Sequence, residues 1–596
     1  MPGSDPPMVS GHAGWLRLPR SGVERVNAAA RSGAGGLVLL ALVVGAGAGL
    51  FAVVFRWLIK QFTLVLSGHP DYAAVPGAAH PGLPGLGRWF LLGAPVVAGL
   101  AYGPLVHFFA REARGHGVPE VMYAVARRGG RIAPQVAAVK ALASALCIGG
   151  GGSVGREGPI VQIGSALGST VGRVLRVPEG RMRVLVACGA AGGIAATFNA
   201  PLAGVFFAME LILADFAAES FGMVVLAAVT ASVIGRAALG SRPFLALPTF
   251  TVQHPAEYVY FAVLGVIAGC VGVGFTRILY LIEDGCDAIW RGPEWLRPAV
   301  GGLALGVVLL VLPQLYGVGY PVLGNAVSGQ YALVFLLVLL LGKMVATSLT
   351  IGIGGSGGVF APSLFMGAML GSAFGIVAHQ LLPGAGPAGA YALIGMGAVF
   401  AGAARAPITA VVIMFELTGE YTIILPLMTA IVLATGIGHR LTQDTIYTLK
   451  LRRRGVHLGI RETIAPGGRV QVSAVMKPLP PAIAADARLA DVALELARTR
   501  YGVLPVARDG TYLGVVTARA VSEALSDGRH DATPVELLVE LPSSVREDTE
   551  VADAIRALDA SDCGAIPVLS AASAGVVGWF DYQNALASLE PVRPAS

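Results

Sequence analysis

Long runs of apolar residues dominate the first three quarters of the chain. Residues 36–55, GLVLLALVVGAGAGLFAVVF, contain no charged residue, and a run of about 20 such residues is long enough to cross a bilayer as a helix. Parts of 258–276 and 300–316 are similar. Two further apolar segments, 201–213 and 406–417, are bounded by proline or glycine and are too short to cross alone. The pattern predicts an all-α polytopic membrane protein with some broken helices, which are tolerated at membrane depth only where they are buried or line a cavity.

The apolar region contains an internal duplication. GSVGREGPIVQIGSALGS (152–169) aligns with GSGGVFAPSLFMGAMLGS (355–372). The blocks around this pair align in the same order: GHGVP (115–119) with GVGYP (317–321), KALASALCIG (140–149) with KMVATSLTIG (343–352), and 189–211 with 395–417. Two repeats, at about 100–215 and 300–420, are therefore expected. Duplicated membrane folds often place their site where the halves meet, near the middle of the bilayer.

The polarity of the chain changes near residue 452, where a normal mixture of charged and apolar residues begins. LADVALELARTRYGVLPV (489–506) aligns with VADAIRALDASDCGAIPV (551–568), and each unit predicts a helix followed by two strands. The predicted organisation is a polar N-terminal segment (1–35), a membrane domain (36–451), a linker (452–468) and two α/β modules (469–526 and 533–592).

Composition and charge agree with a membrane protein. The 596 residues are 55% hydrophobic and only 13% charged, whereas soluble domains carry about 25% charged residues. The net charge of +6 is better explained by basic segments on the cytoplasmic face than by nucleic-acid binding. Clusters at both ends of the apolar region place both termini in the cytoplasm and the protein in the inner or plasma membrane: Arg17, Arg20, Arg25 and Arg31, and Arg452–Arg454.

The sequence carries no complete set of motif residues for catalysis, for a metal site or for a phosphate-binding P-loop. Its five cysteines are widely separated, so neither a disulfide framework nor a metal site is indicated. There is no HExxH motif, and although GGSVG (151–155) and GGSGG (354–358) have the GxSxG spacing, no His–Asp pair is evident beside Ser153. GGGGSVGREGP (149–159) lacks the lysine of a phosphate-binding P-loop. We therefore expect neither an enzyme nor a bound cofactor.

Three loops rich in glycine and proline predict helix starts: GHGVP, GREGP (155–159) and GGVFAP (357–362). A helix N-terminus offers free N–H donors and a partial positive charge. Several such ends directed at one point would hold an anion weakly enough for it to leave again. The alternative is that these residues only allow close helix packing in lipid.

Glu157 is an unusual charge within the GREGP loop. A carboxylate at membrane depth is costly and indicates function, although a salt bridge with neighbouring Arg156 is the simple alternative. The second repeat has Phe360 at the equivalent position. An ionised Glu157 would compete with an anion for the same donors, whereas a protonated one could move away. We expect a gate that also carries protons.

These motifs, together with DTIYTLKL (444–451) and the two C-terminal repeats, resemble the CLC family of chloride channels and anion transporters with paired CBS domains. The resemblance implies a homodimer of subunits built from two inverted halves, each subunit with its own chloride pathway. It implies that Glu157 is the gating residue. It also implies anion-binding positions in the three loops and at one tyrosine: His116, Gly117, Arg156, Gly158, Val359, Phe360 and Tyr447.

Two positions depart from the family pattern. His116 replaces a serine whose hydroxyl faces the anion, and an imidazole N–H could take over that contact. Leu211 stands where many family exchangers have an internal proton acceptor, next to Glu210. The leucine favours channel-like or weakly proton-coupled chloride transport, with H⁺/Cl⁻ exchange as the alternative.

The C-terminal pair resembles CBS domains, which often bind adenine nucleotides. Thr517 and Asp581 match parts of the nucleotide pattern, but neither repeat has the complete set. The alternatives are adenine-nucleotide binding and a purely structural role for the pair.

Overall fold

A computed structural model describes residues 34–240, 257–382, 386–456 and, apart from short gaps, 471–581. The chain forms two compact units, Met1–Leu458 and Gly459–Ser596, which are described separately. Most of the predicted N-terminal segment and linker lies outside the described residues.

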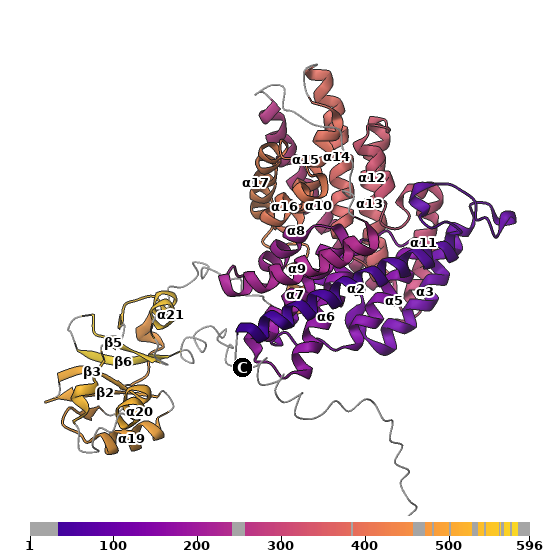
Figure 1. The fold of residues 1–596 in the computed structure, drawn as a ribbon. Helices are drawn as coiled ribbons and strands as arrows, with labels where there is room; N and C mark the ends of the chain where they lie inside the picture. The colour runs from indigo at the N-terminus through magenta and orange to yellow at the C-terminus, as the bar shows by residue number, and fades with distance from the viewer. Residues whose placement is uncertain are drawn as a thin grey trace, which may run out of the picture. The chain divides into compact units, whose positions relative to one another are not determined.

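The first unit is helical and consists of two halves with the same order of elements (Figure 1). The first half contains α2 (Ala34–Ser67), α3 (Phe90–Phe109), α4 (Val118–Arg127), α5 (Gln135–Gly149), α6 (Glu157–Val174), α7 (Glu179–Phe198), α8 (Pro201–Phe207) with a π-helical turn η4 (Ala208–Leu213), and α9 (Ala218–Leu239). The second contains α10 (Glu257–Ile289), α11 (Arg297–Val311), α12 (Tyr320–Val327), α13 (Leu333–Gly352), α14 (Phe360–Leu381), α15 (Ala388–Ala404), α16 (Pro407–Thr418) and α17 (Ile424–Leu441), followed by α18 (Thr448–Arg453).

Packing within the halves is equivalent. Helix α2 packs on α9 and α6 on α7, just as α10 packs on α17 and α14 on α15. The same small residues make the contacts possible, because glycines of one helix lie against alanines of the next: Gly45 and Gly49 on Ala227 and Ala231, and Gly265 and Gly269 on Ala430 and Ala434. Small residues let helix backbones approach closely in a membrane. The duplication thus extends over nearly the whole membrane unit.

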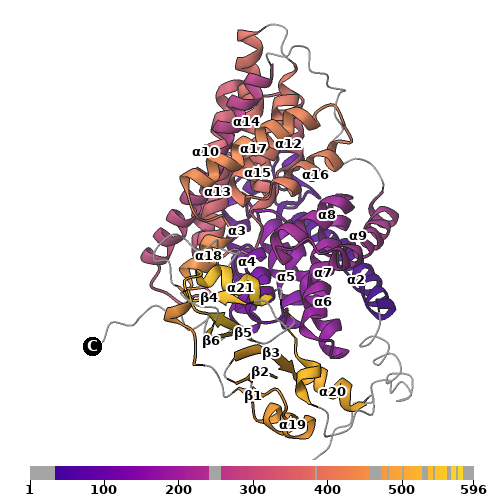
Figure 2. The ribbon, with the colours of Figure 1, turned by 90° about the vertical axis from the view of Figure 1, so that its left-hand side faces the viewer.

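Contacts between the halves join equivalent elements to one another. Helix α3 packs on α11 and α8 packs on α16, and the two groups of helices lie side by side in both views (Figures 1 and 2). A helix that contacts its own counterpart in the other half is expected where a pseudo-twofold axis relates two inverted halves.

Eight helices among the described residues are long and apolar enough to span a membrane, including α2 and α10. The segments 201–213 and 406–417 form short helices, as predicted. The expectation for 300–316 was wrong in length. Helix α11 has 15 residues, because Pro313 begins a separate 3₁₀ turn, Pro313–Leu315, and the residues before a proline leave the helical region.

The second unit contains two small sheets with helices, as expected for a CBS pair. In the first sheet, β1 (Ile483–Ala484) is parallel to β2 (Val503–Arg508), which is antiparallel to β3 (Thr511–Thr517). In the second, β4 (Val545–Arg546), β5 (Ala565–Leu569) and β6 (Val576–Asp581) repeat this order. The helices are α19 (Leu489–Arg498), α20 (Ala518–Ser526) and α21 (Val551–Asp559). Val503 and Val515 of one sheet share an apolar cluster with Ala565 and Trp579 of the other.

Candidate functional site

The three glycine-rich loops meet between the two halves. Gly155 and Gly358 exchange backbone hydrogen bonds of 2.7 and 2.6 Å. The third loop joins them, because the N–H of Gly115 donates to the carbonyl oxygen of Gly355 at 3.0 Å and the N–H of Gly357 donates to that of Gly115 at 3.3 Å. The three loops are therefore hydrogen-bonded into one assembly.

Each loop leads into a helix, as the sequence predicted. Helix α4 begins at Val118 after Gly117, α6 begins at Glu157, and α14 begins at Phe360 after Val359. The first N–H groups of each helix have no acceptor within the helix, so their donors and partial positive charges are brought to one region of the membrane unit.

Glycine is required at two of these positions. A Cβ on Gly158 would overlap the carbonyl oxygen of His116 and lie 3.1 Å from the Cα of Gly358. Gly117 has a φ of +83°, which other L-residues rarely adopt. The close approach of the loops thus depends on missing side chains.

Glu157 lies within this assembly and is 1% exposed. Its Oε1 accepts a hydrogen bond from the hydroxyl of Tyr320. Its Oε2 is buried and makes no hydrogen bond, but the backbone N–H groups of Glu157 and Ala361 face the carboxylate. The carboxylate therefore occupies the region where the helix starts would receive an anion.

No ion pair joins the side chains of Arg156 and Glu157 among the described residues, although the two charges act on each other electrostatically. Its guanidinium lies 5.1 Å from the ring centre of Tyr320 and 6.0 Å from that of Phe198. The Nε and Nη2 atoms are buried without a hydrogen-bond partner. The salt-bridge explanation for the adjacent charges is therefore not supported.

His116 is a second buried polar group that lacks a partner. The side chain is 1% exposed, and neither ring nitrogen makes a hydrogen bond. Lys140, Lys450 and Arg454 act on it electrostatically, and Glu120 partly balances these charges, because its Oε1 lies 3.8 Å from the Nζ of Lys450 and 2.7 Å from the Nη1 of Arg454. An unpaired imidazole with cations nearby can receive an anion through an N–H group.

Tyr447 and Phe360 complete the set of predicted residues. Tyr447 precedes α18 and is 1% exposed, and Glu157 is close enough to act electrostatically on its hydroxyl. The ring of Phe360 packs against Phe198 and Phe400, with ring centres 5.7 and 4.6 Å apart. The Phe360 side chain is thus committed to packing, which leaves its backbone N–H for a ligand.

Two buried lysines at equivalent positions of the repeats hold the loops in place. The Nζ of Lys140 donates to the carbonyl oxygens of Ala113 and Gly115 at 2.9 and 2.7 Å. The Nζ of Lys343 donates to those of Gly317 and Val318 at 3.0 and 3.1 Å. The sequence alignment paired these lysines, and the structure gives the physical reason.

Glu210 and Glu416 have reciprocal structural roles. The Glu210 carboxylate accepts the N–H groups of Ile408 and Thr409 at the start of α16, at 3.1 and 2.8 Å. The Glu416 carboxylate accepts those of Leu202 and Ala203 at the start of α8, at 3.0 and 2.7 Å. Each carboxylate therefore caps the short helix of the other half.

In the second unit, Thr517 and Asp581 lie on different sheets, and each pairs with a residue of the apolar cluster that the two sheets share: Thr517 with Val503 and Asp581 with Ala565. The Thr517 hydroxyl accepts the N–H of Ala520 at 3.1 Å and caps α20. Asp581 ends β6 in the other sheet and lies 3.5 Å from the Nζ of Lys477. Each side chain thus has a local structural role.

The sequence matches the profile described as "Voltage gated chloride channel" over residues 98–439 and that of the CBS domain over 472–527. The first match covers more than half of the chain. The chain belongs to the CLC family.

Known CLC proteins from bacteria are similar along most of their length. A putative chloride channel protein, ClcB-like, of Ralstonia nicotianae is 33% identical over 424 residues, which cover 70% of this chain and 97% of the relative. The H⁺/Cl⁻ exchange transporter ClcA of Vibrio parahaemolyticus is 37% identical over 362 residues, with 59% of this chain and 76% of the relative covered.

Solved CLC structures share the fold. A slow cyanobacterial Cl⁻/H⁺ antiporter matches with a TM-score of 0.63 and 25% identity, over 70% of this chain and 97% of the other. A eukaryotic CLC transporter matches with a TM-score of 0.62 and 21% identity, over 92% of this chain and 97% of the other, and this likeness concerns the fold alone.

Sequence reasoning missed Tyr320. It is the first residue of α12, and the side chain of its repeat counterpart Val118 cannot form a hydrogen bond. The only available signal was a tyrosine within the GVGYP block of the repeat, which does not reveal a contact with a residue 163 positions away.

We expect Tyr320→Phe to let the Glu157 side chain leave its present position more easily. Hydrogen bonds to charged groups contribute about 1.5–3 kcal/mol, so loss of the hydroxyl should destabilise the ionised carboxylate in its present position. Chloride flux in liposomes should rise roughly tenfold near neutral pH, and its pH profile should shift to higher pH. Tyr331→Phe is the control, because its hydroxyl contacts Asn325 instead. An unchanged pH profile in Tyr320→Phe would contradict this role.

Proposed function

We propose that this CLC protein exchanges chloride for protons across the membrane and that Glu157 is both the gate and the proton carrier. The observation that carries the proposal is the position of the Glu157 carboxylate, buried at the convergence of the helix starts and held by Tyr320. An ionised carboxylate and a chloride ion compete for the same donors. Protonation removes the competing charge and lets the anion pass.

The chloride pathway we infer runs between the two halves. Chloride would contact the N–H groups at Gly158, Val359 and Phe360, the imidazole of His116 and the hydroxyl of Tyr447. These groups are dipoles and weak donors, so they replace the hydration shell without binding too tightly for conduction. The two buried lysines add positive charge nearby while their ammonium groups remain bonded to backbone carbonyls.

Exchange is better supported than the channel-like function expected from the sequence. The ClcA relatives carry the name H⁺/Cl⁻ exchange transporter, and a solved neighbour is a Cl⁻/H⁺ antiporter. Passive chloride conduction is the second candidate, favoured by Leu211, an apolar residue that is 8% exposed. Neighbouring Glu210 is occupied as a helix cap, so the internal acid is not simply displaced by one position.

Proton movement in liposomes distinguishes the two functions. We expect that chloride flowing down its gradient, with the membrane potential clamped by potassium and valinomycin, drives protons uphill in the opposite direction. A protonophore should abolish the pH difference. Chloride flux with no uphill proton movement would establish the channel-like candidate instead.

We infer that the protein is a homodimer joined through α8 and α16. The two capping carboxylates on these short helices are only half-buried, and the neighbouring Leu202 and Ile408 are 46% and 41% exposed. Carboxylates facing lipid are costly, and a second copy would cover them. Light scattering in detergent should give twice the chain mass of 60.9 kDa, and a single-chain mass would contradict the dimer.

The membrane placement we propose has both termini in the cytoplasm of a cell whose inner or plasma membrane holds the protein. The tail then forms two cytoplasmic modules, 469–526 and 533–592. We assign the tail a structural role, because Thr517 and Asp581 each have a local partner. Calorimetric titration with ATP, ADP and AMP should give no heat of binding, and heat with any of them would favour a nucleotide site.

A further inference from the structure

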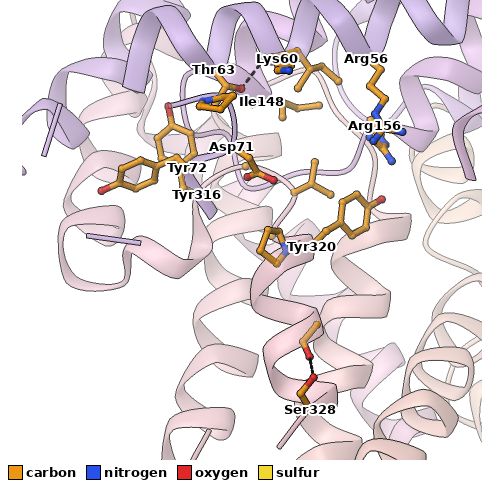
Figure 3. Close-up of a pocket in the computed structure, with 17 residues that line it drawn as sticks. Arg56, Lys60, Thr63, Asp71, Tyr72, Ile148, Arg156, Tyr316, Tyr320 and Ser328 are labelled. Atoms are coloured by element: carbon orange, nitrogen blue, oxygen red, sulfur yellow. Dashed lines mark hydrogen bonds between the residues drawn. The ribbon is translucent and has the colours of Figure 1, made fainter. Parts of the chain in front are cut away.

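A cavity of about 640 Å³ lies directly beside the gate (Figure 3). It is bounded by the C-terminal part of α2, by the loop around Asp71 and by the start of α12, and Tyr320 belongs to its wall. Helix α2 is long enough to cross a bilayer, so this cavity opens at the membrane face opposite to the start of α2. We call it the vestibule.

The vestibule is unusually cationic for a wall built from an apolar helix. Arg56 and Lys60 of α2 line it, together with Arg156 of the GREGP loop. The ends of Arg56 and Arg156 overlap in the view of Figure 3, and the two charges act on each other electrostatically. Among the described residues, no carboxylate lies within ion-pair distance of any of these three cations.

Arg156 gives the vestibule a built donor site. The side chain is 8% exposed, and its Nε and Nη2 atoms are buried without a hydrogen-bond partner. The positive charges of Arg56 and Arg156 repel each other, and an anion between them removes that repulsion. Two N–H groups of one guanidinium can bind two oxygens of the same phosphate or carboxylate group. A spherical halide has no such pair of oxygens and does not use this geometry.

Asp71 is the acidic group that faces the same cavity. Its Oδ1 accepts the N–H of Ala73 at 3.1 Å, and burial raises the pKa of the carboxyl while the charge of Arg156 lowers it. The other titratable groups on the wall are Tyr72, Tyr316 and Tyr320. With Arg56, Lys60 and Arg156 against Asp71, the wall has an excess of positive charge even when Asp71 is ionised.

We propose that the vestibule binds an oxyanion of the phosphate or carboxylate class between Arg56 and Arg156 and that this occupant blocks the approach of chloride to Glu157. The volume supports a ligand larger than chloride, because cavities of about 300–1,000 Å³ typically hold small organic molecules. The protein would then be inhibited from one face of the membrane only. The inhibition rests on the proposed transport function, whereas the binding itself does not.

Binding of inorganic phosphate to the detergent-solubilised full-length protein is the first test. Arg56→Gln should weaken binding roughly tenfold to a hundredfold, because a charge-assisted hydrogen bond is lost. Asp71→Asn should tighten it, since the amide keeps the acceptor for Ala73 and removes only the negative charge. Arg88→Gln, an exposed arginine of the same loop that does not line the cavity, is the control for general charge effects.

Chloride flux in liposomes is the second test. Phosphate added on the vestibule side should slow the flux, phosphate on the other side should not, and Arg56→Gln should relieve the inhibition. Equal losses of binding in Arg56→Gln and Arg88→Gln, or no phosphate binding by the unmodified protein, would overturn the proposal. A protein that binds phosphate as expected but moves no chloride would instead refute the transport function.

Discussion

Glu157→Ala is expected to abolish proton movement while chloride still crosses the membrane. The substitution removes the buried carboxylate at the start of α6, where the three loops meet. Without it, nothing competes with chloride for the backbone donors, and nothing carries a proton past them. The reversal potential of the variant should move to the chloride equilibrium potential, and the flux should lose its dependence on pH.

Two further variants sharpen this prediction. Glu157→Gln keeps an acceptor for the Tyr320 hydroxyl but cannot ionise, so it should also be uncoupled. Glu179→Gln removes an exposed carboxylate that pairs with Arg183 at the start of α7, and it should behave as the unmodified protein. Uphill proton movement that persists in Glu157→Ala would refute the assigned role.

Gly158→Ala is expected to reduce chloride flux to background. The added Cβ would overlap the carbonyl oxygen of His116 and press on the Cα of Gly358, so the three loops would have to separate. Overpacking of this kind typically costs about 1–3 kcal/mol. We expect lower thermal stability together with loss of flux in liposomes, because the donors of the three loops would no longer face one point.

Gly180→Ala is the matched control for Gly158→Ala. Gly180 lies in α7, where a Cβ would meet no atom within 4 Å, and alanine is a better helix former than glycine. This variant should retain its flux and its thermal stability. Normal exchange by Gly158→Ala would mean that the close contact of the loops is not needed for anion passage.

The sequence predicted the parts of the site that depend on local rules. Pro119, Pro159 and Pro362 marked helix starts, and the glycines before them marked positions where the backbone turns or approaches a neighbour. The repeats then implied that these starts come from both halves. Only the structure could show that Gly155 and Gly358 exchange hydrogen bonds, because register between distant loops is set by the packing of whole helices.

Other features were beyond sequence reasoning for physical reasons. The contact between Tyr320 and Glu157 exists only on one side of the pseudo-twofold axis, since the equivalent pair is Val118 and Phe360. The adjacency of Arg56 and Arg156 likewise depends on how α2 crosses the start of α6. The apolar run at α11 continues past the end of the helix, so hydrophobicity alone could not show that the helix ends before Pro313.

The buried lysines bind backbone carbonyl oxygens in the loops that precede the helix starts. Backbone carbonyls exposed by a turn at membrane depth need a donor, and Lys140 and Lys343 provide it once in each half. The pairing of these lysines in the repeats is therefore a consequence of the duplicated loop geometry rather than of chloride binding itself.

An experimental structure determined from bromide-containing solution, with anomalous scattering recorded, tests the central claim most directly. We expect a bromide peak between the starts of α6 and α14, within contact of His116 or Tyr447, and a second peak in Glu157→Ala where the carboxylate of the unmodified protein lies. Bromide found only at the protein surface or in the vestibule, with no peak between residues 155–159 and 357–362, would contradict the account.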